Sequence, residues 1–411
     1  MNKVTLGATG ITAPQNGFGA LPVQRVDMET GVKLLRRARE GGMTYFDTAR
    51  AYTDSEEKLG NAFGKTGERE SVYIATKTQA KTPEAFWKDL ETSLSLLQTD
   101  YIDVYQLHNA AQCYRPDDGT GLYECMAKAK EQGKIRHIGI TAHKIAVAEE
   151  CAKSGLYETL QYPFSYLASD RELALAKTCK ENNVGFIAMK GLAGGLISRS
   201  EVAMAFMTEH DNVMPIWGVQ RASELEEWLS YMEKTPEMTE EIRAYIRQER
   251  ESLAGEFCRG CGYCMPCPQG IEINQCARIS LMLRRAPAAD WLNEHWQAEM
   301  MKIEKCVDCG VCMTRCPYGL NIPELLSIMD VFLFPSLFEG LGIVAIEGMF
   351  AGTPIVVSDV GGLNEIVEHG VTGMKSYAGN PNSIADSILT LLFDQQLANN
   401  IAKNGRNNKF I

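Results

Sequence analysis

The chain has 411 residues, a formal net charge of −11, 45 % hydrophobic residues and 23 % charged residues. This length and apolar content suffice for two or three domains with a large buried core. The acidic balance and the absence of a basic stretch argue against nucleic acid and against an anionic membrane as partners. With no signal-peptide pattern at the start and no apolar run long enough to span a bilayer, we expect a cytoplasmic protein.

Short apolar segments alternate with amphipathic stretches from residue 1 to about residue 235. Eight such strand–helix pairs in this length predict an α/β domain, a (β/α)8 TIM barrel, over residues 1–235. The predicted strands are Gly17–Leu21, Tyr45–Thr48, Val72–Thr76, Ile102–His108, His137–Thr141, Thr159–Phe164, Gly185–Met189 and Val213–Gly218. The predicted helices include Met28–Gly41, Thr82–Leu97, Gly121–Gln132, Asp170–Asn182 and Ala222–Met232, with capping signals at Thr82 and Ser169.

Polar residues end the second, third and fourth predicted strands. Asp47, Lys77 and His108 stand there, and Tyr52 follows shortly after Asp47. Active residues of such barrels lie at the C-terminal ends of the strands, so we expect these four to converge on one rim. A tyrosine phenol, whose ordinary pKa is about 10, becomes a usable general acid when a buried ammonium lowers that pKa. We therefore expect Lys77 to lower the pKa of Tyr52 and to pair with Asp47. His108 would orient a carbonyl oxygen.

A structural interpretation of the same residues stays open at this point. Asp47 and Lys77 could form a buried salt bridge that ties two strands, and His108 could be a hydrogen-bonded core histidine. The presence of all the polar groups together at strand ends favours catalysis over structure.

Five segments of the chain resemble the aldo-keto reductase family, in the branch that carries a C-terminal two-cluster ferredoxin module. The resemblance covers residues 1–325 and implies a nicotinamide cofactor, NADP(H) or NAD(H), across the barrel mouth and a small-molecule carbonyl substrate. The segments are YFDTARAY (45–52), IATKT (74–78), DYIDVYQLHN (100–109), GKIRHIGIT (133–141) and AMKGLAGG (188–195).

The resemblance also implies a set of cofactor contacts. Thr141 and Gln161 would address the carboxamide, and Phe164 would stack near the nicotinamide ring. Lys190, Gly191 and Gly194 would line the path of the pyrophosphate, although the same residues also fit an ordinary strand-to-helix turn.

Two departures from the family pattern bear on these contacts. Thr141-Ala142 stands where the family often has Ser-Asn, so His143 is a candidate for the second carboxamide contact. The last barrel loop, IWGVQRASELEE (216–227), lacks the family's 2′-phosphate signature. Arg221 is the candidate substitute, and the choice between NADPH and NADH stays open.

Two cysteine motifs follow the barrel, in residues 236–328, where the pattern turns helical. They read CRGCGYCMPCP at 258–268 and CVDCGVCMTRCP at 306–317. The second has the C-x2-C-x2-C-x3-C-P spacing of bacterial iron–sulfur ligation, and the first has one residue fewer before its last cysteine. We therefore predict an all-helical ferredoxin-like domain with two [4Fe–4S] clusters.

In two-cluster ferredoxins the fourth cysteine of each motif binds the other cluster. This rule assigns Cys258, Cys261, Cys264 and Cys316 to one cluster and Cys306, Cys309, Cys312 and Cys267 to the other. Structural zinc is the alternative, because four-cysteine zinc sites also use C-x2-C spacing. Zinc needs only two such pairs for each ion, so the triplets that end in Cys-Pro favour clusters.

The last part of the chain, residues 329–411, returns to a strand–loop–helix–strand pattern. With Glu339 and Glu347 eight residues apart, it resembles the donor-nucleotide half of a retaining glycosyltransferase of the two-Rossmann type. We predict a partial Rossmann-like α/β fragment that binds no sugar nucleotide by itself. Two parallel strands and three helices would leave an apolar face uncovered.

Three functions are compatible with this organisation. The leading prediction is an oxidoreductase that reduces an aldehyde or ketone with NAD(P)H and carries two [4Fe–4S] clusters for electron transfer, with a one-electron carrier of ferredoxin or flavodoxin type as a further partner. The alternative is an electron-transfer protein whose barrel no longer does carbonyl chemistry. Glycosyltransferase activity is the third, and the incomplete fragment disfavours it.

The metal prediction is tested by elemental analysis of the chain purified without oxygen. Two [4Fe–4S] clusters predict about eight iron and about eight sulfide per chain. One or two zinc ions with no acid-labile sulfide would establish the alternative instead.

Overall fold

The computed structural model describes residues 1–64, 67–253, 257–260, 262–279, 281–282, 291, 293–322, 331–340, 342–350 and 352–407. Two compact units result. The first comprises Met1–Pro266, Leu281–Asn293 and Val311–Leu320, and the second comprises Cys267–Ser280, Glu294–Gly310 and Asn321–Ile411. Among the described residues, no helix combines the length and the apolar character that a bilayer crossing requires.

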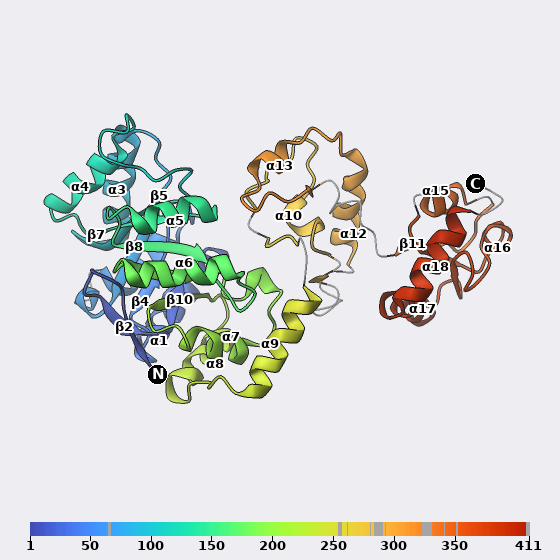
Figure 1. The fold of residues 1–411 in the computed structure, drawn as a ribbon, viewed down its shortest axis with the longest axis horizontal. Helices are drawn as coiled ribbons and strands as arrows, with labels where there is room; N and C mark the ends of the chain where they lie inside the picture. The colour runs from blue at the N-terminus through green and yellow to red at the C-terminus, as the bar shows by residue number, and fades with distance from the viewer. Residues whose placement is uncertain are drawn as a thin grey trace. The chain divides into compact units, whose positions relative to one another are not determined.

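The first unit contains a closed barrel of eight parallel strands in the order β10-β3-β4-β5-β6-β7-β8-β9 (Figure 1). Every predicted strand is present, so the barrel prediction is confirmed. The strands are β3 (Gly17–Gly19), β4 (Tyr45–Asp47), β5 (Tyr73–Thr78), β6 (Ile102–Leu107), β7 (Ile135–Thr141), β8 (Thr159–Pro163), β9 (Gly185–Met189) and β10 (Val213–Gly218).

Helices surround the barrel, and local sequence signals start several of them. The Thr82 hydroxyl accepts a hydrogen bond from the Ala85 amide at 3.3 Å, and Ser169 forms a capping box with Glu172. The helices are α1 (Met28–Glu40), α2 (Ser55–Leu59), α3 (Pro83–Leu97), α4 (Leu122–Glu131), α5 (Ile145–Lys153), α6 (Asp170–Glu181), α7 (Ser200–Thr208), α8 (Ala222–Glu233) and α9 (Glu240–Ser252). Shorter turns are η1 (Pro22–Arg25), η2 (Gly60–Gly64), η3 (Arg69–Ser71) and η4 (Ala193–Gly195).

An N-terminal hairpin of β1 (Lys3–Thr5) and β2 (Thr12–Pro14) closes the N-terminal end of the barrel. Its apolar side chains pack on inward-facing residues that include Tyr45, Ala75 and Val104. Because side chains alternate along a strand, the next inward position on each strand lies two residues later. That position is held by a polar residue on β4, β5 and β6, so the opposite end of the barrel interior is polar.

The cysteine-bearing part of the chain contains short helices separated by turns and coil where the structure describes it. Its elements are α10 (Ile273–Cys276), α12 (Glu294–Met301), η6 (Lys302–Lys305) and α13 (Val311–Arg315). α10 begins at Ile273, and residues 280 and 283–290 after it lie outside the described residues.

The C-terminal part of the second unit is a three-stranded parallel sheet with helices on both faces. Ile355 and Val357 of β12 pack on one apolar core, and Val356 between them packs on another. The expectation of an uncovered apolar face is therefore wrong, because α17 and α18 supply the second layer. The elements are β11 (Phe332–Phe334), α15 (Ile343–Phe350), β12 (Ile355–Ser358), α16 (Leu363–Ile366), β13 (Met374–Ser376), α17 (Pro381–Phe393) and α18 (Gln395–Arg406).

Candidate active site

A buried ion pair occupies the polar end of the barrel interior. Lys77 Nζ on β5 donates to Asp47 Oδ1 on β4 at 2.6 Å and to the Thr48 carbonyl at 2.5 Å. The two residues are 1 % and 3 % exposed. Burial raises the pKa of Asp47 and lowers the pKa of Lys77, and the opposite charge of the partner works against both shifts.

Two glutamines extend this pair across the barrel. Gln106 Nε2 on β6 donates to Gln161 Oε1 on β8 at 3.0 Å and lies 3.4 Å from Asp47 Oδ2. Gln161 Nε2 donates to Asp47 Oδ1 at 3.4 Å. Both polar atoms of the Gln161 amide therefore already have partners inside the barrel. This weakens the expectation that Gln161 binds the carboxamide of the cofactor.

Tyr52 and His108 stand beside the ion pair, as the sequence predicts. Their rings meet edge to face with centroids 5.9 Å apart, and Lys77 Nζ lies 5.4 Å from the centroid of the Tyr52 ring. The expected pKa shift of Tyr52 is wrong in sign. Burial of the phenol, and next the negative charge of Asp47, raise the pKa of Tyr52. Tyr52 is therefore protonated at neutral pH.

His108 and His143 line the same end of the barrel as neutral imidazoles. Burial, and next the charge of Lys77, lower the pKa of His108 to about 3. Burial and the charge of Lys190 lower the pKa of His143 well below its ordinary value. Among the described residues, neither ring nitrogen of His143 nor Nδ1 of His108 has a hydrogen-bond partner. These nitrogens are available to a polar ligand.

A residue of the first cysteine motif reaches this group. The Tyr263 ring lies edge to face on the His143 ring with centroids 4.6 Å apart. The charge of an ionised Tyr263 also contributes to the raised pKa of Tyr52. Tyr263 therefore forms part of the barrel mouth.

The predicted cofactor residues occupy different environments. Thr141 Oγ1 at the end of β7 accepts from the Asn109 amide at 2.6 Å. A Cβ atom at Gly191 would collide with the Trp217 ring, and Gly194 has a φ of +69° that suits glycine. Arg221 is 72 % exposed at the start of α8, near Glu224.

The Phe164 ring does not reach the mouth. It packs between β9 and α7, with centroid distances of 5.3 Å to Phe186 and 5.4 Å to Phe206. The alternation of side chains explains this placement, because Gln161 points into the barrel and Phe164, three residues later, points outward. This placement disfavours the expected stacking of Phe164 on a nicotinamide ring.

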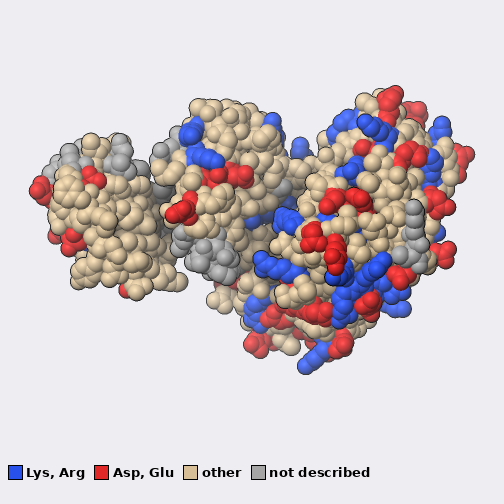
Figure 2. Space-filling model, turned by 180° about the vertical axis from the view of Figure 1, so that it is seen from behind, with Lys and Arg blue, Asp and Glu red and all other residues tan. Residues whose placement is uncertain are grey.

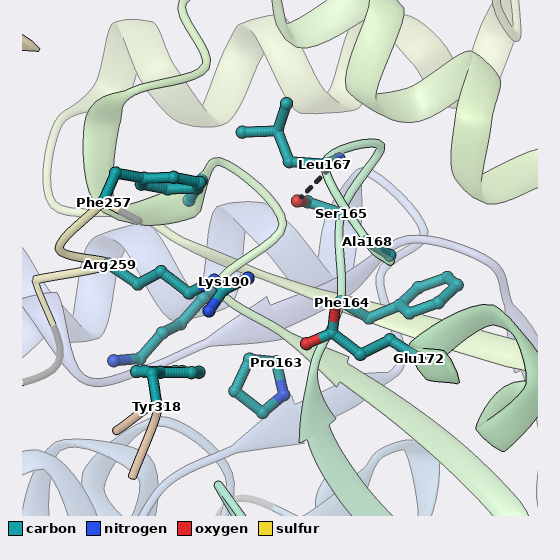
Figure 3. Close-up of a pocket in the computed structure, with 11 residues that line it drawn as sticks. Pro163, Phe164, Ser165, Leu167, Ala168, Glu172, Lys190, Phe257, Arg259 and Tyr318 are labelled. Atoms are coloured by element: carbon teal, nitrogen blue, oxygen red, sulfur yellow. Dashed lines mark hydrogen bonds between the residues drawn. The ribbon is translucent and has the colours of Figure 1, made fainter. Parts of the chain in front are cut away.

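A pocket lies at the ends of β8 and β9 (Figure 3). Lys190 lines it from the barrel, and Phe257, Arg259 and Tyr318 line it from the segments of the two cysteine motifs in the first unit. The other lining residues are Pro163, Phe164, Ser165, Leu167, Ala168, Glu172 and Ala193.

The cysteines of the two motifs differ in exposure. Cys258 and Cys264 are buried, and Cys267, Cys312 and Cys316 are partly buried. Cys306 and Cys309 are exposed, and Cys261 lies outside the described residues. In the described part of the chain, no three histidine, cysteine, aspartate or glutamate residues lie close enough to hold one metal ion. The assignment of cysteines to two clusters stays a prediction.

Backbone amides already point at two of these sulfur atoms. The Gly260 amide donates to Cys258 Sγ at 3.4 Å, and the Gln269 amide donates to Cys267 Sγ at 3.4 Å. Such N–H···S bonds are among the contacts that tune cluster potentials. Cysteine sulfur atoms with such amide donors are the type of ligand that suits iron–sulfur clusters.

Residues 6–205 match the aldo/keto reductase family model. The barrel is thus similar to members of the aldo/keto reductase family. Aldo-keto reductase YhdN of Bacillus subtilis is 30 % identical over 218 residues, which are 48 % of this chain and 64 % of that protein. The solved structure of aldo-keto reductase AKR11C1 from Bacillus halodurans in its holo form is 24 % identical, covers 62 % of this chain and 98 % of its own, and superposes with a TM-score of 0.54. This likeness supports the fold.

The rest of the chain matches two further families. Residues 257–321 match a 4Fe-4S dicluster domain, and residues 315–408 match the glycosyl transferases group 1. The uncharacterized glycosyltransferase MJ1607 of Methanocaldococcus jannaschii is 44 % identical over 88 residues, which are 21 % of this chain and 23 % of that protein. The chain thus spans less than two thirds of the length of both curated relatives.

The glutamates of the glycosyltransferase-like part are only partly described. The Glu339 carbonyl accepts from the Gly362 amide at 3.0 Å and so joins two loops of the sheet. Glu347 lies in α15, and its side chain is outside the described residues.

Three residues of the mouth were not predicted as site residues from the sequence. Arg259 and Tyr263 stand between motif cysteines, where they read as spacers, and Tyr318 follows Cys316-Pro317. Only the folded arrangement places them against the barrel. Gln106 lies within a quoted family segment, and its inward position follows from the alternation along β6.

The neutral state of His108 predicts a pH dependence of stability. Its pKa in the folded chain is about 3, below the ordinary value of about 6.5 that applies after unfolding. The unfolded chain therefore binds more protons between these values, and the free energy of unfolding falls as the pH drops below about 6.5. Histidine NMR should show a neutral His108 ring at pH 5, and His108→Gln should flatten the pH dependence of unfolding. A His108 signal that titrates near pH 6.5 would contradict the structure.

Proposed function

We propose that the barrel reduces a small-molecule aldehyde or ketone with NADPH or NADH. The observation that carries this proposal is the convergence of Tyr52 and His108 beside the buried Lys77–Asp47 pair, at the C-terminal end of an aldo/keto reductase barrel. A reduction of this kind needs a proton donor and a hydrogen-bond donor at the carbonyl oxygen. The bound nicotinamide supplies the hydride.

Tyr52 is the proposed proton donor. Its raised pKa keeps the phenol protonated at neutral pH, which is the form that can give a proton to the developing alkoxide. Lys77 lies 5.4 Å from the centroid of the Tyr52 ring and stabilises the phenolate that remains after the proton has left. Asp47 holds the ammonium of Lys77 in place.

His108 is the proposed orienting group. Its neutral ring carries one N–H, which can donate to the carbonyl oxygen while the oxygen becomes negative. The neighbouring Tyr52 ring fixes the face that His108 presents. Tyr52 and His108 would thus address the same oxygen.

The residues of the mouth fit a nicotinamide nucleotide. The unpaired nitrogens of His143 offer polar contacts. Thr141, Lys190 and Gly194 would contribute to its binding, and His143 is a better candidate than Gln161 for the carboxamide, because the Gln161 amide is engaged within the barrel. Arg221 is exposed and would be available to a 2′-phosphate.

The eight motif cysteines would hold two [4Fe–4S] clusters that transfer electrons one at a time, and a small carrier protein of ferredoxin or flavodoxin type would be their partner. Such clusters suit a reducing compartment such as the cytoplasm. The match to a 4Fe-4S dicluster domain favours a second candidate function, in which electron transfer through the clusters is the whole activity. The two functions differ in whether a hydride passes from the nucleotide to a carbonyl.

Tyr52→Phe tests the proposed chemistry. Loss of the general acid should lower kcat for aldehydes by on the order of 10²- to 10⁴-fold, while the Kd for NADPH stays within about twofold. The matched control is Tyr45→Phe, because Tyr45 is a buried tyrosine on β4, the strand that precedes Tyr52, and its hydroxyl has no hydrogen-bond partner among the described residues. Equal turnover by the wild type and Tyr52→Phe would count against the proposal.

A further inference from the structure

The pocket at the ends of β8 and β9 is built by two parts of the first unit. Lys190 belongs to the barrel, and Arg259 belongs to the first cysteine motif, directly after the predicted cluster ligand Cys258. Tyr318 follows the last cysteine of the second motif. Figure 3 shows the side chains of Lys190 and Arg259 next to each other in the pocket, with their charged ends pointing in different directions.

Two aromatic rings hold the Arg259 side chain. Its Cζ atom lies 4.4 Å from the centroid of the Tyr318 ring and 5.2 Å from the centroid of the Phe257 ring. Contact with ring faces leaves the N–H groups at the edge of a guanidinium free to donate to an anion. Among the described residues, no carboxylate forms an ion pair with Arg259.

One carboxylate, that of Glu172, also lines the pocket. Its Oε2 accepts from the Ser169 amide at 2.8 Å and from the Ser169 hydroxyl at 3.0 Å, and its Oε1 lies 3.4 Å from the Tyr162 hydroxyl. Glu172 is therefore committed to the capping box at the start of α6. Two cations and one committed carboxylate therefore line the described part of the pocket.

We propose that Arg259 and Lys190 together bind the phosphate groups of the nicotinamide nucleotide. This inference rests on the proposed function and adds to it that the cysteine-bearing segment supplies a cofactor ligand. A guanidinium can bind phosphate through two parallel hydrogen bonds, and an ammonium adds a point charge. The loop after β9 requires glycine for internal reasons, because a side chain at Gly191 would collide with Trp217 and because Gly194 and Gly195 have positive φ.

Binding of phosphate by both cations would couple the barrel to the segment that bears the first cysteine motif. A nucleotide bound to Lys190 alone would depend on the barrel only. A nucleotide bound to both cations also depends on the position of residues 257–260, which the ligation of Cys258 would fix. Nucleotide affinity is therefore expected to report the state of the first motif.

The test compares nucleotide binding by the full chain, purified without oxygen, with binding by Arg259→Ala. We expect the Kd for NADPH and for inorganic pyrophosphate, measured by calorimetry, to rise by about 10- to 100-fold, the effect of losing a charge-assisted hydrogen bond. Arg259→Lys should recover part of the loss, because it keeps the charge and loses the fork. Iron and sulfide content, measured on every variant, must match that of the wild type.

The matched control is Arg315→Ala. Arg315 directly precedes the motif cysteine Cys316, just as Arg259 directly follows Cys258. Unlike Arg259, Arg315 is exposed, does not line the pocket and donates to the Pro266 carbonyl at 3.1 Å. Its loss should leave both Kd values within about twofold of the wild type.

The outcomes separate the inference from the proposed function. Unchanged Kd values in Arg259→Ala, with carbonyl turnover intact, would overturn the inference and leave the reductase proposal standing. Pyrophosphate binding that depends on Arg259, without any carbonyl turnover by the wild type, would support the phosphate site and overturn the reductase proposal. Absence of both nucleotide and pyrophosphate binding by the wild type would overturn both.

Discussion

The ion pair between Lys77 and Asp47 is the interaction on which the polar end of the barrel depends. It joins β4 to β5, and Gln106 and Gln161 tie the same carboxylate to β6 and β8. Removing either charge would leave its partner buried and uncompensated, at a cost of about 3–5 kcal/mol. The pair therefore fixes the strand ends from which Tyr52 and His108 are presented.

The same pair sets the protonation states of the groups around it. Lys77 contributes to the low pKa of His108, and Asp47 contributes to the high pKa of Tyr52, although burial is the larger cause in both cases. The result is a neutral imidazole next to a neutral phenol. Two hydrogen-bond donors thus face one region without a net charge between them, which suits a carbonyl oxygen that becomes negative during the reaction.

The first unit extends beyond the barrel. Tyr263 lies on His143, and Arg259 and Tyr318 line the pocket next to Lys190, so residues near the motif cysteines complete the mouth. A segment that looks like an independent electron-transfer module in the sequence therefore also shapes the site where hydride chemistry is proposed. The glycosyltransferase-like part has two apolar cores of its own and belongs to the second unit.

Much of the barrel could be predicted from the sequence, because buried parallel strands are short, apolar and regularly spaced. The four polar residues of the mouth were predictable for the same reason, since they end those strands. The raised pKa of Tyr52 could not be predicted from the sequence, because the burial of a phenol depends on segments that fold over it. The position of the Phe164 ring was inferred from the family resemblance. The alternation of side chains along the strand, counted from the inward-facing Gln161, places this ring on the outer side of the barrel instead. Arg259 and Tyr263 depend on contacts between distant segments, which local patterns do not contain.

Transfer of deuterium from the nucleotide tests the central claim most directly. The chain, purified without oxygen, is given NADPH deuterated at each face of the nicotinamide C4 in turn, together with a panel of small aldehydes. The account predicts that deuterium from one face only appears at the carbinol carbon of the alcohol, and that Tyr52→Phe abolishes this product. Reduced clusters with no labelled alcohol, or an alcohol whose carbon-bound hydrogen comes from solvent, would show that electrons leave the nucleotide by a different path and would contradict the account.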